Sequence, residues 1–316
     1  MRTETTNIMR DARPPKRMRR QSSSLPENMN GISDGEIFSV RMSDKDFVRL
    51  SEFIRSSCGI KLPPAKKTML EGRLRKRLRA LSIRSFERYC EFLFSPDGSE
   101  SEYIHMIDAV TTNKTDFFRE PDHFDFLFER ALPELVGLYG DGARKKFNVW
   151  SAACSTGEEP YTLAMVLSEF SQCCPGFGFS ILATDISTAV LEKARSGIYE
   201  HDRVIPVPME LRKKYLLKSR KKETGLVRIA PELRNSVQFG RLNLQEEEYG
   251  INVPISILFC RNVLIYFDRP TQEKLLKRLS QHLMPGGYLF VGHSESLHGM
   301  DLPLVQTATT IYRKQQ

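Results

Sequence analysis

The sequence predicts a small all-α domain followed by an α/β domain with a parallel sheet, and three observations support this fold class. The apolar stretch Val149–Ala152 leads through a turn of small residues, Ser155–Gly157, into an apolar helix. A second apolar stretch, Ile181–Thr184, ends on a carboxylate, Asp185. Earlier in the chain, from Phe47 onward, apolar residues recur at spacings of three and four, which is typical of amphipathic helices.

The turn and the carboxylate form a pattern that α/β proteins use to hold a nucleoside. Asp185 lies 28 residues after Gly157. A turn of small residues lets a ligand approach backbone amides, and a carboxylate at the carboxyl end of a strand can accept both ribose hydroxyls. The sequence therefore indicates an enzyme with a nucleoside-containing cofactor.

The residues at the start of the helix narrow the choice of cofactor. A dinucleotide site uses three glycines to bring a pyrophosphate to a helix N-terminus, whereas this turn has Gly157 alone, followed by Glu158 and Glu159. Carboxylates there would repel a pyrophosphate but suit the sulfonium and ammonium groups of S-adenosylmethionine. A purely electrostatic role at the helix N-terminus stays open for either glutamate. We expect S-adenosylmethionine as the methyl donor, with S-adenosylhomocysteine as the product.

Length and composition limit the classes of protein to which the chain can belong. With 316 residues, of which 40% are hydrophobic, the chain can hold two modest domains. No apolar run approaches the roughly 20 residues that span a bilayer, and the basic N-terminus lacks the apolar core of a secretory signal. Neither the six cysteines nor the six histidines show metal-ligand spacing. We therefore expect no metal, and a reduced, cytoplasmic setting.

The net charge of +8 is concentrated in two segments. Met1–Arg20 carries a net charge of +5 and Lys66–Arg79 carries +6, so the rest of the chain is net negative. Charge that is concentrated in this way is typical of a surface that binds a partner. Residues 1–36 are polar and show no periodicity, so we predict a disordered basic tail, for which a solvated state is the simpler interpretation than contact with nucleic acid or acidic lipid.

Residues 37–112 are predicted to form the helical domain. Its predicted helices cover residues 47–54, Ala65–Leu81, Phe86–Phe94 and Tyr103–Val110, with a loop at Ser95–Ser101. The leucines of the second helix form one apolar stripe. The basic residues off this stripe are predicted to face solvent: Arg73, Arg75, Lys76 and Arg79.

Residues 113–316 are predicted to form the α/β domain. A helix over His123–Leu138 precedes an alternation of strand Phe147–Ala152, helix Pro160–Phe170, strand Ser180–Thr184 and helix Thr188–Ser196. A charged segment at about 198–236, in which Gly225–Ile229 has strand character, interrupts the alternation and is predicted to be an inserted small β-subdomain. The later elements are strands Val237–Phe239 and Ser256–Cys260, helix Gln272–Leu283, strand Gly287–Gly292, and a final strand, Thr307–Tyr312, at an antiparallel edge.

Six motifs in order resemble the CheR family, the chemotaxis receptor methyltransferases that esterify glutamate side chains with S-adenosylmethionine. The motifs are TTNKTDFFRE (Thr111–Glu120), WSAACSTGEEPY (Trp150–Tyr161), ATDIS (Ala183–Ser187), LNL (Leu242–Leu244), FCRNVLIYF (Phe259–Phe267) and GGYLFVGHSES (Gly286–Ser296). The resemblance covers residues 38–312. It implies a Rossmann-like S-adenosylmethionine-dependent methyltransferase domain with the inserted subdomain, preceded by the small all-α domain.

The resemblance also implies the cofactor-binding residues. They are Asn113, Thr115, Arg119, Glu159, Asp185, Asn243, Leu244, Arg261 and Asn262. Asp185 would accept from the ribose hydroxyls, Glu159 would pair with the ammonium group, and the amide of Asn243 would suit the adenine edge.

The resemblance also implies two catalytic residues, Arg119 and Tyr266. A glutamate carboxylate has an unperturbed pKa of about 4.3 and is already ionised near neutrality, so the reaction needs no general base. Alignment and desolvation would supply most of the acceleration. Arg119 would orient the attacking carboxylate bidentately, or bind the carboxylate of the donor. Tyr266 would position or polarise groups at the methyl, although a packed aromatic role stays open for it.

Other classes fit the sequence less well. A dinucleotide oxidoreductase needs the missing glycines. A small-molecule or nucleic-acid methyltransferase would usually carry a base or an Asn-Pro-Pro-Tyr-type clamp where this chain has Arg261–Leu264. A non-enzymatic scaffold would be expected to lose some of the cofactor residues, and all nine are present.

The partners follow from the resemblance together with the charge. Receptor methylation regions are acidic helical bundles, and the basic helix Lys66–Arg79 suits docking on one, with a merely solvated face as the alternative. Some family members also bind a receptor C-terminal peptide on the inserted subdomain. The loop Leu217–Thr224, LKSRKKET, lacks the glycine pair expected of those members, so a peptide tether is left open. We expect a monomer with no nucleic-acid partner and no membrane insertion.

Overall fold

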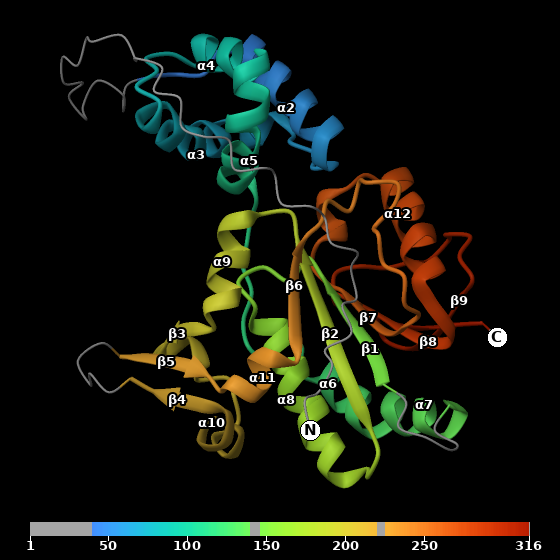
Figure 1. Cartoon of the computed structure of the whole chain (residues 1–316). Coiled ribbons are helices and arrows are strands. Elements are labelled where there is room, and N and C mark those ends of the chain that lie inside the picture. The colour runs from blue at the N-terminus through green and yellow to red at the C-terminus, as the bar shows by residue number, and fades with distance from the viewer. Residues whose placement is uncertain (1–39, 140–145, 220–224, 316) are drawn as a thin grey trace. The chain divides into compact units, whose positions relative to one another are not determined.

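The computed structural model of the chain describes residues 40–139, 146–219 and 225–315, which form two compact units (Figure 1). The first unit holds the helices up to Val110 together with Gly250–Asn252, apart from Ser57–Lys61, which belongs to the second. The second unit also holds Thr111–Tyr249 and the chain from Val253 onward. The predicted disordered tail, residues 1–36, lies outside the described residues.

The first unit is all-α, as the sequence predicts. Its described elements are α2 (Asp44–Cys58), η1 (Pro64–Lys66), α3 (Lys67–Ala80), α4 (Phe86–Leu93) and α5 (Pro96–Val110). Leu70, Leu74 and Leu78 of α3 are fully buried, which confirms the predicted leucine stripe. Within the described ranges, no helix of either unit combines the length and apolarity needed to cross a membrane.

The predicted loop at Ser95–Ser101 is wrong, because α5 already begins at Pro96. The Ser95 hydroxyl accepts a hydrogen bond from the Gly98 amide at 3.2 Å, as a helix N-cap does. Proline suits the first helical position, where its missing N–H has no intrahelical partner to lose. The Ser-Pro pair is therefore a helix start rather than a loop.

The predicted exposure of the basic residues of α3 holds for Lys76 and is wrong for the three arginines, which are half-buried. Arg75 forms an ion pair with Glu71 of the same helix. Arg73 donates to the carbonyl of Val110. Arg73 and Arg75 therefore stabilise the helical unit, and less of the helix's charge is available to a partner than its sequence suggests.

The second unit is built on a seven-stranded sheet of order β6-β2-β1-β7-β8-β10-β9 (Figure 1). Its strands are β1 (Lys146–Ala152), β2 (Gly178–Asp185), β6 (Val237–Arg241), β7 (Ile255–Cys260), β8 (Leu283–Val291), β9 (Leu304–Ala308) and β10 (Ile311–Lys314). In the sheet order, the strands from β6 to β8 are parallel to one another, β10 is antiparallel to β8, and β9 is antiparallel to β10. The helices of this unit are α6 (Asp122–Phe126), α7 (Leu132–Tyr139), α8 (Glu158–Cys173), α9 (Thr188–Ser196), α11 (Pro231–Asn235) and α12 (Arg269–His282). This confirms the predicted α/β class.

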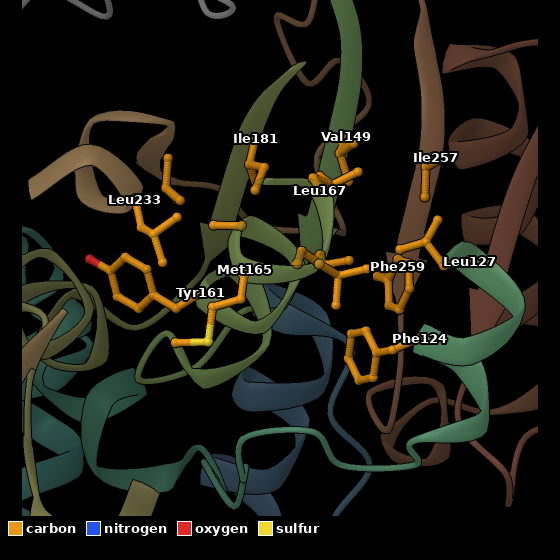
Figure 2. Close-up of a cluster of buried hydrophobic side chains, with 14 of the residues drawn as sticks. Phe124, Leu127, Val149, Tyr161, Met165, Leu167, Ile181, Leu233, Ile257 and Phe259 are labelled. Carbon is orange, nitrogen blue, oxygen red and sulfur yellow. The ribbon is translucent and has the colours of Figure 1, made fainter. Parts of the chain in front are cut away.

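Alternate residues of each central strand supply two buried faces. Val149 pairs in register with Ile181 on β2 and Ile257 on β7, and these residues face α6, α8 and α11 (Figure 2). Trp150 points to the other face, where its ring lies 5.9 Å from that of His282 at the end of α12. Because both faces are covered, the central strands read as continuous apolar runs rather than as alternating ones.

The interrupting segment forms a separate three-stranded antiparallel sheet of order β3-β5-β4, as the predicted insertion requires. Its elements are β3 (Ile198–Glu200), η3 (His201–Val204), α10 (Met209–Tyr215), β4 (Leu216–Lys218) and β5 (Leu226–Ile229). The sequence pattern indicated β5 alone, because strands of three residues are too short to show alternation. Most of the basic loop Leu217–Thr224 lies outside the described residues.

The single final strand predicted at Thr307–Tyr312 is wrong, since a hairpin replaces it. β9 ends at Ala308 and β10 starts at Ile311, with Thr310 in a left-handed conformation at φ 57° between them. β10 pairs with β8, so β9 is the antiparallel edge. Threonine is an unusual residue for a left-handed turn, but the Thr310 hydroxyl is held by His123 Nε2 at 2.9 Å.

The predicted helix over His123–Leu138 contains one wide turn. α6 and α7 are separated by a π-helical turn, η2 (Leu127–Ala131). Pro133 follows this turn and, in a regular helix, would clash with the carbonyl of Glu129 and lose a hydrogen bond. The π turn lies where the proline needs that extra room.

Candidate active site

Four neighbouring parallel strands reach the same level, where Ala152, Thr184, Cys260 and Val291 lie in register at or next to the strand ends. The residues that follow them therefore emerge along one edge of the sheet. From β1 the chain moves to one side for β2 and β6, and to the other side for β7 and β8 (Figure 1). The carboxyl edge between β1 and β7 is thus a topological switch point, where open α/β sheets bind ligands.

The turn after β1 has an uncommon backbone. Ala153, Ser155 and Gly157 have φ values of 63°, 50° and 97°, which lie in the left-handed region that residues with a Cβ rarely adopt. The Cys154 amide donates to the Thr184 carbonyl at 2.9 Å, which anchors the turn to β2. Backbone strain of this kind clusters at ligand-binding loops. The sequence predicted the turn at Ser155–Gly157, but not the left-handed backbone of Ala153 and Ser155.

Asp185 lies against the turn and is buried. One of its oxygens accepts from the Ser155 amide at 2.9 Å and the other from the Ser187 amide at 3.0 Å. Its backbone carbonyl accepts from Leu242 at 3.0 Å, which brings the loop after β6 alongside. Asp185 therefore links the turn to the segment that carries two further predicted residues, Asn243 and Leu244.

The predicted residues Asn113 and Asn243 make structural contacts here. The Asn113 carbonyl accepts from the Ser155 hydroxyl at 3.1 Å. Asn243 Nδ2 donates to the Ser57 carbonyl at 2.7 Å, and its Oδ1 accepts from the Gln245 amide at 3.0 Å. The Asn243 side chain thus holds its own loop, which sequence analysis did not anticipate. Leu244 is buried.

Arg261 is the centre of a buried charge network. Its side chain is 2% exposed and pairs with Glu159 at 3.3 Å and with Glu120 at 3.0 Å. It also donates to the Arg119 carbonyl. The Ser151 hydroxyl donates to the other oxygen of Glu159 at 2.7 Å. Arg261, Glu159 and Arg119, which lie far apart in the sequence, therefore meet at the switch point.

The two carboxylates beside Arg261 are perturbed in opposite directions. Burial raises the pKa of Glu159 above its usual value, although Arg261 and Ser151 oppose this. Burial alone would also raise the pKa of Glu120, but Arg261 and the donors Asn262 and His293 hold it below its usual value. Opposed shifts of neighbouring carboxyls are typical of functional sites.

Arg119 differs from Arg261 in its surroundings. Its side chain is half-exposed, and its Nη1 donates to the Lys114 carbonyl at 3.0 Å. No carboxylate in the described part of the chain forms an ion pair with it. Tyr266, at the end of η5 (Leu264–Tyr266), is half-buried, and its carbonyl accepts from the Lys61 amide at 2.9 Å.

Glu295 is a residue of this site that sequence analysis did not single out. Its carboxylate accepts from four backbone amides at 2.6–3.3 Å, those of Gly292, Asn262, Leu264 and Ile265. Burial raises the pKa of Glu295, and these amides oppose the rise. Asn262 itself is left-handed at φ 58°. Glu295 therefore holds the strained loop between Arg261 and Tyr266.

Glu158 and Glu159, expected together at the helix start, point to different partners. Glu158 is buried and pairs with Arg203 of η3 at 2.8 Å. It also accepts from the Thr156 hydroxyl at 2.6 Å. The expectation that both carboxylates would suit a cationic ligand therefore applies to Glu159, while Glu158 is an internal ion-pair partner.

Among the described residues, one cluster has side chains that could ligate a metal: Glu120, His123 and His293, whose ligand atoms lie within 4.8 Å of one another. Burial lowers the pKa of His123 to about 4. The Glu120 carboxylate accepts from Arg261, Asn262 and the His293 amide, so its lone pairs are already used. A second cation there would be repelled by Arg261.

A switch-point edge, a strained turn of small residues and a strand-end carboxylate together define an α/β enzyme that binds a nucleoside cofactor. The family comparison identifies which kind. Residues 113–312 match "CheR methyltransferase, SAM binding domain", and residues 45–111 match "CheR methyltransferase, all-alpha domain". The chain belongs to the CheR methyltransferase family and is an S-adenosylmethionine-dependent methyltransferase.

Three curated relatives support this assignment, and each is named "Chemotaxis protein methyltransferase". The Salmonella typhimurium protein is 39% identical over 291 residues, which cover 92% of this chain and 97% of the relative. The Escherichia coli protein is 38% identical over 294 residues, covering 92% and 98%. The Borreliella burgdorferi protein is 37% identical over 277 residues, covering 87% and 96%.

Proposed function

We propose that this methyltransferase esterifies specific glutamate side chains in the cytoplasmic methylation helices of chemoreceptors. The family membership and the relatives' names support a chemotaxis methyltransferase. The observation that supports a glutamate side chain as the methyl acceptor is the contrast between two arginines. Arg261 is held between two carboxylates, whereas Arg119 at the same edge has a half-exposed guanidinium and no carboxylate partner among the described residues. A guanidinium in that state suits an incoming glutamate carboxylate.

We propose two groups of cofactor contacts. Asn113, Thr115, Asp185, Asn243 and Leu244 would hold the adenosine part. Asn113 and Asp185 contact the turn after β1, and Leu242, which precedes Asn243 and Leu244, bonds to the end of β2. Glu159, Arg261 and Asn262 would hold the amino-acid part around the buried ion pairs. The Arg119 guanidinium would bind the donor's carboxylate only as the alternative to the substrate carboxylate. Bound S-adenosylmethionine supplies an electrophilic methyl on a sulfonium. Glu159 fits the ammonium group of the donor because Arg261 neutralises only part of the negative charge of Glu120 and Glu159.

The transfer itself needs alignment rather than proton transfer. A carboxylate oxygen of the substrate bonds to the methyl carbon as the carbon–sulfur bond breaks, and the electron pair stays on sulfur, giving S-adenosylhomocysteine. The glutamate is ionised beforehand, so no proton moves. Arg119 would orient the substrate carboxylate, and Tyr266 would position groups at the methyl. Fixed donors at a half-buried edge supply the alignment and the partial desolvation.

We propose the domain boundaries, the oligomeric state, the location and the docking helix together with this receptor substrate. We propose domains at 37–112 and 113–316, preceded by the tail at 1–36, and a monomer that works in the cytoplasm, where the receptor helices are. The basic helix α3 would dock those acidic helices. No role of nucleic acid or of a metal enters the reaction.

The test is the chemistry of the product. The protein is incubated with radiolabelled S-adenosylmethionine and receptor cytoplasmic fragments, and the labelled product is treated with base. Carboxyl methyl esters release volatile methanol under base, so we expect volatile label, which should disappear when the acceptor glutamates are replaced by Ala. Arg119→Lys, which keeps the charge but loses the planar fork, should reduce kcat/KM for the receptor. A base-stable label would instead indicate a methylated amine or nucleobase.

A further inference from the structure

The inserted subdomain is tied to the proposed cofactor edge by two side chains. Tyr199 of β3 is buried, and its hydroxyl donates to the Thr156 carbonyl at 2.8 Å. A Cβ on Gly157 would lie 2.8 Å from that hydroxyl, so glycine is needed for the approach. The second contact is made by Arg203 of η3, which follows Tyr199 in the inserted segment.

Arg203 contacts both segments that line the cofactor edge. Its Nη2 donates to Glu158 Oε1 at 2.8 Å and to the Thr115 carbonyl at 2.6 Å, and its Nη1 pairs with Asp116 at 3.0 Å. Glu158 opens α8 directly after the strained turn. Thr115 and Asp116 belong to the segment that also carries Arg119. One guanidinium thus joins the insertion, the helix start and this segment.

The charges at this junction make Arg203 hard to replace. The Glu158 side chain is only 2% exposed, and Arg203 is its cationic partner. Without that partner, a buried carboxylate would be left uncompensated beside the turn. The planar fork of arginine also matches three acceptors at once, which a lysine ammonium on a flexible stem does less well.

We propose that Arg203 is a positioning residue for the cofactor: it holds residues 115–116 against the start of α8, so that the inserted subdomain forms part of the cofactor site's support. It does not touch the cofactor or the reacting atoms. The expected consequence is that losing the Arg203 fork weakens binding of S-adenosylmethionine and S-adenosylhomocysteine more than it slows the chemical step. This inference rests on the cofactor contacts proposed above.

The test measures S-adenosylhomocysteine binding by calorimetry in four variants of the full chain. Arg203→Ala should raise Kd about tenfold, and Arg203→Lys should give an intermediate Kd. The double variant Arg203→Met, Glu158→Gln removes both charges, so no buried charge is left unpaired. We expect its melting temperature to return toward the wild-type value while its Kd stays raised by about fivefold or more.

The fourth variant, Arg228→Ala, is the matched control. Arg228 belongs to the same inserted sheet, is exposed, and donates to the Ser196 carbonyl at 3.1 Å rather than to the helix start or to residues 115–116. The Kd of Arg228→Ala for S-adenosylhomocysteine should stay within about twofold of the wild-type value, as expected for a position independent of the cofactor site. Steady-state kinetics should show a raised KM for S-adenosylmethionine with kcat nearly unchanged in the Arg203 variants, whereas partial unfolding would lower kcat.

Two results would overturn the proposal. A wild-type Kd in the double variant would mean that Arg203 only neutralises Glu158. A Kd raised equally in Arg228→Ala would mean that the whole inserted sheet matters and Arg203 has no special part. The double variant decides the question even if Arg203→Ala alone fails to fold. Failure of the wild-type chain to bind S-adenosylhomocysteine would contradict the cofactor site itself, and the base-lability assay tests the substrate class separately.

Discussion

Asp185 shows, at the scale of one residue, how a carboxylate can be anchored and still accept a ligand. Each of its oxygens accepts one backbone amide, from Ser155 or Ser187. A carboxylate has about four lone-pair sites, so anchoring by these two amides does not by itself prevent it from accepting a ribose hydroxyl. The two amides fix the orientation of the Asp185 carboxylate.

We predict that Asp185→Ala weakens S-adenosylmethionine binding by about 1.5–3 kcal/mol, because hydrogen bonds to a charged group are lost. Calorimetry gives the affinity, and circular dichroism checks the fold, since two buried amides also lose their acceptor. Asp185→Asn, which keeps one carbonyl acceptor, should lose less. Asp301→Ala is the matched control, because Asp301 is fully exposed in the same unit. Native-like spectra with unchanged affinity would remove Asp185 from the site.

At the scale of elements, the loop after β7 depends on one carboxylate from the loop after β8. Glu295 satisfies four amides that would otherwise lie unpaired around Asn262 and η5. Arg261 and Tyr266 flank this loop, so its conformation decides where both side chains are.

We predict that Glu295→Gln lowers the free energy of unfolding by roughly 1–3 kcal/mol and also lowers kcat/KM, because the amide NH₂ of glutamine faces amide donors. Urea denaturation and steady-state kinetics measure the two effects. Glu247→Gln, at an exposed glutamate of the same unit, should change neither. Wild-type stability and activity in Glu295→Gln would show that the loop holds its conformation without this carboxylate.

The basic helix α3 divides into residues that stabilise the helical unit and residues available to a partner. Arg77 forms a two-fold hydrogen-bonded pair with Glu102 at 2.8 and 2.7 Å. Lys66, just before the helix, and Lys76 on it are exposed. Charge reversal at Arg73 and Arg79 would therefore disturb folding, so these arginines are poor probes of docking.

We predict that Lys66→Glu with Lys76→Glu raises KM for an acidic receptor fragment severalfold while cofactor affinity stays unchanged. The wild-type rate at subsaturating receptor should fall as salt rises, since surface charges are screened over a Debye length of about 8–10 Å. Lys193→Glu with Lys274→Glu makes the same charge change at exposed lysines of the other unit. Equal kinetics for the two double variants would place docking elsewhere, for example on the inserted subdomain.

At the scale of the whole molecule, stability depends on keeping His123 neutral. His123 is fully buried in the second unit, among Glu120, Asp122, His293 and Arg261. The Thr310 hydroxyl donates to the Thr309 carbonyl and so accepts from His123 Nε2. Burial lowers the pKa of the imidazole from 6.5 to about 4. Between these values the unfolded chain binds a proton that the folded chain does not.

We therefore predict that the free energy of unfolding falls as pH drops from about 6.5 toward about 4, and that this contribution is fully present above about 6.5. In this pH window, the free energy of unfolding should change with pH more steeply in the wild type than in His123→Gln, by about 1.4 kcal/mol per pH unit. Glutamine keeps a donor for Thr310 but does not titrate. Urea denaturation at several pH values measures both slopes, and parallel slopes would show that His123 does not titrate in this range.

The sequence by itself determined the features that local chemistry encodes. The strands at Phe147–Ala152 and Ser180–Thr184 follow from continuous apolar runs, and the helix at Thr188–Ser196 from helical periodicity. Their ends follow from small residues, caps and Asp185. The motifs from Thr111 to Ser296 were enough to indicate the family. At Ser95–Pro96 the missed information was also local, whereas the turn at Thr310 is held by His123, which lies 187 residues earlier in the chain.

Only the tertiary structure decided which charges are partners. Arg203 meets Glu158 across 45 residues, Glu295 meets the Leu264 amide across 31, and Arg261 meets Glu120 across 141. No periodicity relates such positions, because their proximity is set by strand order and by the common level at which the parallel strands end. For the same reason the sequence presented Glu158 and Glu159 as one acidic pair, while the folded chain buries one against the insertion and directs the other to the switch point.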